Sequence, residues 1–520
     1  MDKEKNLDSI LALEKQIEEC EGHEKTIIQL KRARNSLLNV SILLPEVLGS
    51  VFCWNVITDG EFGGLPKGSY NFLLVCHHWF EVASCTPDLW SFWGNSIRDW
   101  AHRHVRCRTA PLDLVLDGVE GQELGCQLRD ALRDSAVRDG IRQVHLGEYS
   151  GGQAILNSII SSIVVEGEEA RSSSVESFIV KYSHRPDVDV SAFFSRYHFP
   201  KLRCLQLSGC NISSWNLLES RITTLTTLKL ADGLSPTLTP SQLFSILSSN
   251  PLLKDLSLSL CSDPHAVGSD RPFYPVPLLH LADLHLWSNS FHTAFWLLDR
   301  LGLPDKMGSL DMLLHNCSPA DITQTLGPYF GDRIRRRGEF PDGRRNLSVR
   351  YGRSSINLSI RSANIDHDFP EEKWLANVHV FIGVPLTDEE AVGIWFDFIA
   401  HVPLEQVTEL RTNLPILCSE ELCVGMCNLT YLHLLQVDLT RPFADPDIRA
   451  LHTFSEILPG LDRLRINGYT IGHDGWEHLT HFLTRRAAAG NRVSLITFDH
   501  HEMPQGVVES IEHVVEVFER

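Results

Sequence analysis

The segments 202-LRCLQL-207, 225-LTTLKL-230, 253-LKDLSL-258 and 281-LADLHL-286 repeat one six-residue pattern of leucines. A weaker copy runs from Leu310 through Leu313 to Asn316-Cys317, and successive copies begin 23, 28, 28 and 29 residues apart. Leucines that alternate with polar residues predict a strand with one buried face. One such unit cannot bury that face alone, so we expect neighbouring strands to pair in parallel and helices to cover their apolar side.

The pattern L-x-x-L-x-L at this period resembles the leucine-rich repeat. The resemblance implies an α/β fold, with a curved solenoid of irregular repeats over residues 111–520 and parallel strands on its inner face. Within this solenoid we expect an irregular insertion near residues 327–375. Further strands are expected at 111–116, 142–146, 378–382, 429–434, 461–466 and 493–498, and an amphipathic helix at 507–518 closes the array.

A second informative stretch, residues 43–93, is dense in large apolar side chains. Pro45 suits the first position of a helix, and the apolar residues that follow recur with helical spacing. Another apolar run starts at Phe72 and continues to Ala83, and Thr86-Pro87 separates it from a third short helix. A unit this small cannot bury all of these side chains, so some apolar surface should remain exposed for a partner.

The order L-P-E-V-L, L-L-V-C-x-x-W and T-P-x-L-W in this stretch resembles an F-box, in the form found in large fungal families of F-box proteins. That family docks on a Skp-type adaptor of an SCF ubiquitin ligase. Two features depart from its pattern: a longer glycine-rich loop at residues 55–69, and His77-His78 where the family often has Arg or Lys. A plain three-helix subdomain that closes a larger core is the alternative. The resemblance implies that the following residues bind the adaptor: Leu44, Pro45, Glu46, Val47, Leu48, Leu74, Val75, Cys76, Trp79, Leu89 and Trp90.

These patterns predict a division of the chain into an N-terminal amphipathic helix (1–40), the F-box (41–95), a helical linker (96–110) and the solenoid (111–520). The heptad pattern of the N-terminal helix does not persist, so a long coiled coil is not expected. The helix could form a short coiled coil or lie on the F-box. The arginines between Arg333 and Arg345 could form a nuclear-import or anion-binding patch, or an exposed loop.

Composition narrows the class of protein. The chain has 520 residues, with 47 basic and 66 acidic side chains and a net charge of -19. This negative net charge argues against nucleic-acid binding through the phosphate backbone. Thirteen cysteines, many within apolar segments, fit reduced thiols of an intracellular protein in the cytoplasm or nucleus. The chain shows no signal-peptide core and no apolar run long enough to span a membrane.

Motifs that carry catalysis are missing from the sequence: we find no phosphate-binding loop, no nucleophile elbow and no protein-kinase set. Cys418, Cys423 and Cys427 lack a second C-x-x-C. The group His473, Glu477, His478 and His481 is not an H-E-x-x-H motif, so a closed zinc site is not expected. We therefore expect a non-catalytic protein without a metal or cofactor.

The repeat also predicts where a target would bind. Side chains alternate along a strand, so the residues between the leucines share the face opposite the core. Aromatic and arginine side chains contribute most to interfaces, which favours Trp287, Tyr431, Arg463 and Arg465 as target-binding residues. For Trp287 and Tyr431, packing beneath a neighbouring loop is equally compatible with the sequence.

The sequence thus favours a substrate-recognition subunit of an SCF-type ubiquitin ligase, which binds a Skp-type adaptor through the F-box and an unknown protein target through the repeats. The alternative is a leucine-rich-repeat interaction scaffold that acts without a ubiquitin ligase.

Overall fold

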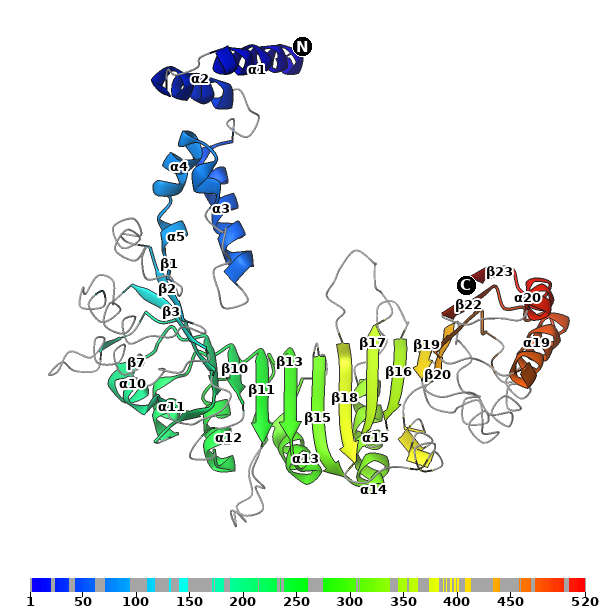
Figure 1. Cartoon of the computed structure of the whole chain (residues 1–520). Helices are drawn as coiled ribbons and strands as arrows, with labels where there is room; N and C mark the ends of the chain where they lie inside the picture. Colours follow the sequence, from blue (N-terminus) through cyan, green and yellow to red (C-terminus); the bar gives the residue numbers. More distant parts are fainter. Residues whose placement is uncertain are drawn as a thin grey trace. The chain divides into compact units, whose positions relative to one another are not determined.

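A computed structural model gives the fold of the chain (Figure 1). The structure describes residues 2–19, 24–36, 43–60, 71–93, 110–116, 131, 140–147, 171–172, 174–181, 188–213, 215–231, 234, 238–260, 275–304, 307, 309–336, 345–352, 355–362, 374–382, 387, 390, 393–394, 397–398, 400–401, 407–412, 434–439, 458, 460–468, 473–499 and 505–519. The chain divides into two compact units, Met1–Leu238 and Thr239–Arg520, which are described separately.

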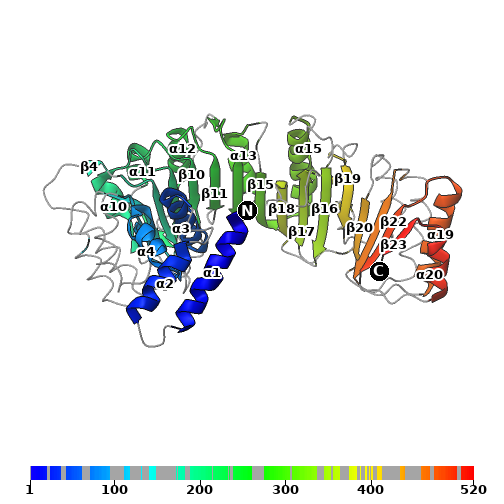
Figure 2. The ribbon, with the colours of Figure 1, turned by 90° about the horizontal axis from the view of Figure 1, so that it is seen from above.

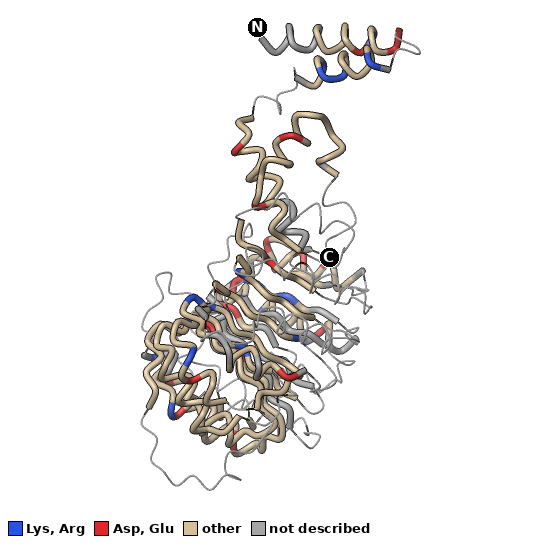
Figure 3. The backbone as a smooth tube through the Cα atoms, turned by 90° about the vertical axis from the view of Figure 1, so that its left-hand side faces the viewer, with Lys and Arg blue, Asp and Glu red and all other residues tan. Residues whose placement is uncertain are grey.

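The first unit begins with two helices, α1 (Asp2–Glu19) and α2 (Glu24–Ser36), where the sequence predicted one. Gly22 lies at the break between them. Helix α1 carries mainly acidic side chains and α2 mainly basic ones (Figure 3). Arg34 pairs across the two helices with Glu14, at 3.7 Å between Nη1 and Oε1. This pairing fits the opposite charges of the two segments.

A small helical unit follows, which we define as residues 43–60 and 71–93. It contains α3 (Pro45–Gly60), the 3₁₀ turn η2 (Asn71–Leu74), α4 (His77–Ser84) and α5 (Pro87–Trp90). Its core consists of Leu48, Phe52, Val82, Ala83, Leu89 and Trp90. The indole Nε1–H of Trp90 donates to the Ala83 carbonyl oxygen at 2.7 Å, so the largest core side chain has its polar atom satisfied.

The main sheet of the first unit is parallel. Its strands are β1 (Phe92–Trp93), β2 (Leu112–Leu116), β3 (Ile141–Leu146), β5 (Ser177–Lys181), β8 (Cys204–Ser208) and β10 (Thr227–Leu230). Each pairs with the next in that order. The predicted strands at 111–116 and 142–146 are thus confirmed. Leu205 lies opposite Leu228, so the leucines of successive copies form one buried row.

Shorter elements of the first unit border this sheet. Strands β4 (Arg171–Ser172) and β7 (Tyr197–His198) pair with each other, as do β6 (Val188–Asp189) and β9 (Cys210–Asn211). Helices α10 (Ser191–Arg196) and α11 (Asn216–Arg221) lie between strands in the sequence. Phe193 and Phe194 of α10 pack on Phe178 of β5, with Phe193 stacked at 4.4 Å between ring centroids. This cluster joins the helix to the apolar side of the sheet.

The main sheet of the second unit combines parallel and antiparallel pairs. Parallel pairing joins β11 (Asp255–Leu260), β13 (Asp283–Ser288), β15 (Ser309–Cys317) and β18 (Trp374–Ile382). Antiparallel pairing then joins β18 to β17 (Ser355–Ser362) and β17 to β16 (Arg345–Gly352). Parallel pairing resumes through β19 (Val407–Thr412), β20 (Leu434–Leu439), β21 (Arg463–Gly468), β22 (Leu495–Asp499) and β23 (Val517–Glu519).

Helices cover the leucine side of this second sheet, where the views in Figures 1 and 2 place α13 beside β13 and β15. They are α12 (Pro240–Ser248), α13 (Phe291–Arg300), α14 (Pro319–Asp321), the π-helical turn η5 (Ile322–Leu326), α15 (Gly327–Arg336), α19 (His473–Ala488) and α20 (Gln505–Glu512). Thr239 starts α12 with a capping box to Gln242, which satisfies two backbone N–H groups. A two-stranded pair, β12 (Val276–Pro277) with β14 (Leu301–Gly302), lies nearby in the sequence.

The predicted fold, an F-box followed by a leucine-rich-repeat solenoid, is wrong, although its α/β class holds. In a solenoid each strand pairs with the strand of the preceding repeat, in chain order. Here β15 pairs with β18, and the chain returns through antiparallel β17 and β16, so the described strands form mixed, mostly parallel sheets. The helical unit continues directly into β1, which pairs with β2.

Three more expectations are corrected or lie outside the described residues. The irregular insertion expected at 327–375 contains helix α15 and strands β16, β17 and the start of β18. The closing helix expected at 507–518 ends at Glu512, and Val517–Glu519 forms a strand. Most of the helical linker expected at 96–110 lies outside the described residues.

The parallel pairing of the four best leucine copies is confirmed within each unit, with Leu205 opposite Leu228 and Leu256 opposite Leu284.

Candidate protein-docking site

The helical unit exposes a large share of its apolar side chains. Leu74 is 85% exposed, Trp54 71% and Leu44 65%. The other exposed members are Leu43, Val47, Val51, Val75 and Phe80. A single exposed leucine is ordinary, whereas several within one small unit mark a surface that a partner covers. We call these eight side chains the apolar docking surface.

Two stripes of apolar residues run along α3. Leu44, Val47, Val51 and Trp54 recur every three to four positions and stay exposed. Leu48 and Phe52 lie on the adjacent stripe and are buried, at 1% and 2% exposure. The sequence predicted only a helical spacing of the apolar residues in this segment, and Trp54 was not among the expected adaptor-binding residues. The spacing of Trp54 from Val47 and Val51 is the signal that could have found it.

Three residues expected to bind the adaptor belong to the core instead. Leu48, Leu89 and Trp90 are almost fully buried, so they hold the helices together and cannot contact a partner directly. Trp79 is half-buried, and its ring packs on Phe52 at 5.2 Å between centroids. Cys76 is also half-buried.

The remaining expected residues are exposed at two places in the helical unit. Leu44, Pro45, Glu46 and Val47 lie at the start of α3, and Leu74 ends η2, with Val75 directly after it. Both predicted segments thus contain exposed residues, whereas Leu48, Leu89 and Trp90 are buried in the core of the helical unit.

Local chemistry fixes the start of α3 and its approach to α5. Pro45 occupies the first turn, where its lack of an N–H costs no hydrogen bond. Glu46 follows, and a carboxylate is favourable near the positive end of the helix dipole. A Cβ on Gly49 would lie 2.9 Å from Thr86 Oγ1, so a glycine there lets the two helices meet closely.

Charge is sparse in the helical unit. Residues 43–60 and 71–93 contain no lysine or arginine, and their carboxylates are Glu46, Asp59, Glu81 and Asp88. The tube in Figure 3 is accordingly tan over most of this unit, with isolated red positions. His77 Nδ1 lies 3.2 Å from Glu81 Oε2, one turn along α4. The surface therefore suits a partner that contributes mainly apolar contacts.

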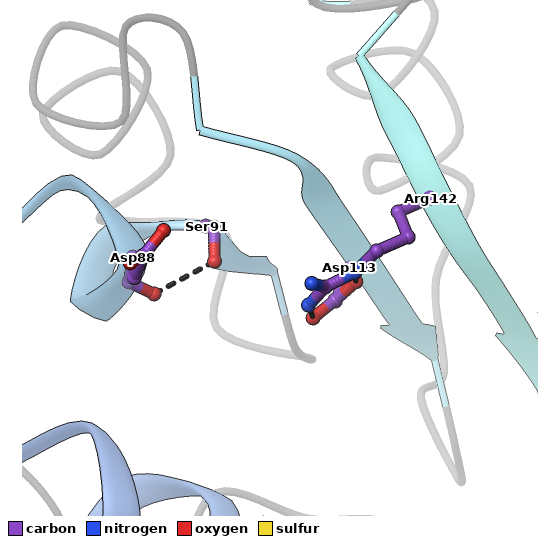
Figure 4. Close-up of polar contacts among 4 residues, drawn as sticks. All are labelled: Asp88, Ser91, Asp113 and Arg142. Atoms are coloured by element: carbon purple, nitrogen blue, oxygen red, sulfur yellow. Dashed lines mark hydrogen bonds and ion pairs between the residues drawn. The ribbon is translucent and has the colours of Figure 1, made fainter. Parts of the chain in front are cut away.

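A polar network attaches the helical unit to the first sheet (Figure 4). Ser91 Oγ donates to the Asp88 carbonyl oxygen at 2.7 Å, and the Asp113 N–H donates to the Ser91 carbonyl oxygen at 2.9 Å. The Arg142 guanidinium binds both carboxylate oxygens of Asp113, from β3 to β2. This fork joins residues 29 positions apart, so no local sequence signal announces it.

Burial dominates the electrostatics of this network. It raises the pKa of the Asp113 carboxyl above its usual range, and the hydrogen bond from Arg142 offsets that rise only in part. The hydrogen bond to Asp113 in turn raises the pKa of Arg142. Asp88 and Glu176 add negative charge that favours the cationic guanidinium. We interpret the pair as a structural connection between β2 and β3.

The structure does not bring together the three expected target-binding residues that it describes, Trp287, Arg463 and Arg465. Trp287 on β13 is 45% exposed and stacks on His315, at 6.4 Å between ring centroids. Arg463 and Arg465 are exposed on β21, and Arg463 pairs with Asp462 at 3.8 Å.

The path from β13 to β21 crosses β15, β18, β17, β16, β19 and β20. At about 4.8 Å per strand, this path is roughly 34 Å along the sheet. One short segment of a target therefore cannot contact both Trp287 and the β21 arginines. Tyr431 lies outside the described residues.

The described residues contain neither a metal-binding cluster nor a membrane-spanning helix. No group of three or more His, Cys, Asp or Glu is placed to hold a metal ion among those residues. Among the described helices, none combines the length and apolar character that a membrane crossing requires. Cys418, Cys423 and Cys427, which were not expected to form a closed zinc site, lie outside the described residues.

Comparison with known proteins adds no family. No protein-family model matches the chain, and no curated protein matches it in sequence. The functional conclusion consequently rests on the chemistry of the surfaces above.

Proposed function

We propose that this protein is the substrate-recognition subunit of an SCF-type ubiquitin ligase. In this proposal the apolar docking surface binds a Skp-type adaptor, and the second sheet holds a protein target. The protein itself makes and breaks no covalent bond, needs no cofactor, and works inside the cell, where the ligase operates. The observation that carries the proposal is the concentration of exposed apolar side chains on the helical unit whose sequence resembles an F-box.

The physical basis is the hydrophobic effect. Covering an exposed leucine side chain stabilises a complex by roughly 1.5–3 kcal/mol at most. Leu44 and Leu74 are the two most exposed leucines of the surface, so they are the best positions for a test. Each lies outside the buried core of the helical unit, which means that truncation should leave the fold intact.

The test measures binding of a purified Skp-type adaptor to the full chain. Leu44→Ala combined with Leu74→Ala should weaken binding by about 30-fold or more, since each truncation at an interface costs about 1–2 kcal/mol. Leu279→Ala is the matched control, because Leu279 is also exposed, at 71%, but lies in the second unit. Equal adaptor affinity of the double variant and the control, in proteins with unchanged circular dichroism, would rule out this docking surface.

An interaction scaffold that acts without a ubiquitin ligase is the second candidate. The exposed Trp287 on β13 favours it, because this residue belongs to the second unit, whereas the expected adaptor-binding residues belong to the first. A scaffold would capture its target but fail to co-purify with the adaptor. Adaptor binding therefore separates the two candidates.

A further inference from the structure

The open face of β11, β13 and β15 carries a specific set of side chains. Leucines on these strands point to the buried side, and the alternate residues occupy the other side. None of the alternate side chains from Asp255 to Ser259, Asp283 to Trp287 or Ser309 to His315 is fully buried. We define the aromatic–acidic face by the following six residues: Asp255, Asp283, His285, Trp287, Asp311 and His315.

Trp287 is the aromatic centre of this face. Its ring is nearly parallel to the His315 ring, at an interplanar angle of 29°, and it remains 45% exposed. Stacking on the neighbouring strand holds the indole in one orientation, with part of its surface open to solvent. A fixed, half-exposed indole offers both apolar area and the negative face of a π system.

Three carboxylates, Asp255, Asp283 and Asp311, share this face with the indole and with two histidines. Asp255 lies directly opposite Asp283 in the parallel register, and like charges in such a position repel. Ser309 Oγ donates to Asp283 Oδ1 at 2.6 Å, and His285 Nδ1 lies 3.4 Å from Asp311 Oδ2. The sequences of β11, β13 and β15 contain no lysine or arginine. The indole face and the carboxylates are the kinds of group that bind a cation.

The distances between Trp287 and the carboxylates indicate which kind of cation the face could bind. Asp311 pairs with His285 in register, so it lies diagonally from Trp287, at about 7–8 Å between backbones. One guanidinium can stack on the indole and still reach this carboxylate. The Asp255–Asp283 pair lies two rows further back on the strands, about 13 Å from Trp287 along β13. A second cation three to four residues away in an extended segment would reach it.

We propose that the aromatic–acidic face binds an extended, arginine-containing segment of the target protein. Arginine fits better than lysine, because its planar guanidinium both stacks on an aromatic ring and forms paired hydrogen bonds with a carboxylate. The inference rests on the proposed function only in assigning this segment to the target. It also replaces the separated anchors on β13 and β21 with one local site.

The probe is a fluorescein-labelled peptide with two arginines separated by two residues, titrated by fluorescence anisotropy against the full chain. Peptides with lysine or glutamate in place of both arginines serve for comparison. We expect binding in the order arginine, lysine, glutamate. Trp287→Ala should weaken arginine-peptide binding roughly tenfold, and Trp287→Phe should weaken it less, since phenylalanine retains part of the cation–π interaction.

The carboxylates are tested with Asp283→Asn and Asp311→Asn. Their combination should weaken binding and reduce its dependence on salt concentration, because two charge contacts are lost. Asp299→Asn is the matched control, since Asp299 on α13 has an 82% exposed side chain beside Arg300, away from the strand residues. It should change affinity less than twofold, whereas non-specific attraction to the acidic chain would make all three substitutions equivalent.

Two results would overturn the inference: equal binding of arginine and glutamate peptides, or unchanged binding by folded Trp287→Ala protein. Neither result bears on the adaptor. A chain that binds the peptide but not the adaptor refutes the proposed ligase role alone. A chain that binds the adaptor but not the peptide refutes the aromatic–acidic face alone.

Discussion

Arg486 of α19 provides the sharpest test of how the second unit is held together. Its side chain is fully buried, and it donates to three backbone oxygens: Nε to Asn491 at 3.1 Å, Nη1 to Leu458 at 2.7 Å and Nη2 to Leu461 at 3.0 Å. These bonds tie the end of the helix to the turn that precedes β21. The guanidinium also lies over the Phe482 ring, at 5.8 Å from its centroid.

We expect Arg486→Met to destabilise this region by about 2–5 kcal/mol. The methionine keeps an apolar stem of similar length but leaves the three carbonyl oxygens without their donors. A hydrogen bond from a charged donor contributes roughly 1.5–3 kcal/mol, and an unsatisfied buried acceptor costs about 1–3 kcal/mol. Burial lowers the pKa of Arg486, which shows that desolvation of the cation offsets part of this gain. The estimate therefore stays below the sum of three bonds.

Hydrogen exchange measured by mass spectrometry is the suitable assay, because a chain of two units does not unfold in one step. Amides in residues 458–468 and 486–499 should exchange about 30-fold faster or more in Arg486→Met protein. Arg485→Met is the matched control, since Arg485 precedes it on the helix and is exposed. Exchange in Arg486→Met protein that matches the Arg485→Met control would refute the assigned role of these hydrogen bonds.

Two further predictions concern packing and thiol chemistry. Gly331→Ala should destabilise α15 by about 1–3 kcal/mol despite the better helix propensity of alanine, because the new Cβ would lie 2.0 Å from the His401 carbonyl oxygen. Gly506→Ala, on α20 with nothing within 4 Å, should instead be neutral or stabilising, and thermal unfolding of both variants checks the sign. Burial raises the pKa of the Cys317 thiol to about 12, so at pH 9 only about one thiol in a thousand is a thiolate. Peptide mapping after iodoacetamide treatment at pH 9 should find exposed Cys85 alkylated and Cys317 protected; rapid labelling of Cys317 in folded protein would contradict its burial.

Much of the secondary structure follows from periodicity alone. The leucines of 202–207, 225–230, 253–258 and 281–286 alternate with polar residues, and each copy contains a strand in the structure. The parallel register was also predictable, because successive copies repeat the same leucine pattern, which places equivalent leucines side by side. Strands at 111–116, 142–146, 378–382 and 493–498 were located for the same reason, and Pro45 marked the start of α3.

The arrangement of the candidate docking site could be predicted from the sequence only in part. The density of apolar residues in 43–93 predicted that some would be exposed, and Leu44 and Leu74 are. Which ones are exposed depended on how three short helices pack, and that packing buried Leu48, Leu89 and Trp90 instead. Periodicity within one helix gives the position of each stripe but not the partner it faces. The docking role of the exposed stripe stays a prediction.

The sequence by itself determined the α/β class, the positions of many strands of the two main sheets and the small helical unit, because these depend on side-chain alternation and helix spacing over a few residues. Only the tertiary structure decided that β15 pairs with β18 and that β17 and β16 follow in antiparallel order. It also decided the fork between Asp113 and Arg142 and the three hydrogen bonds of Arg486. Each of these contacts joins segments far apart in the chain, and an alternating strand is compatible with many neighbours until the whole sheet has formed.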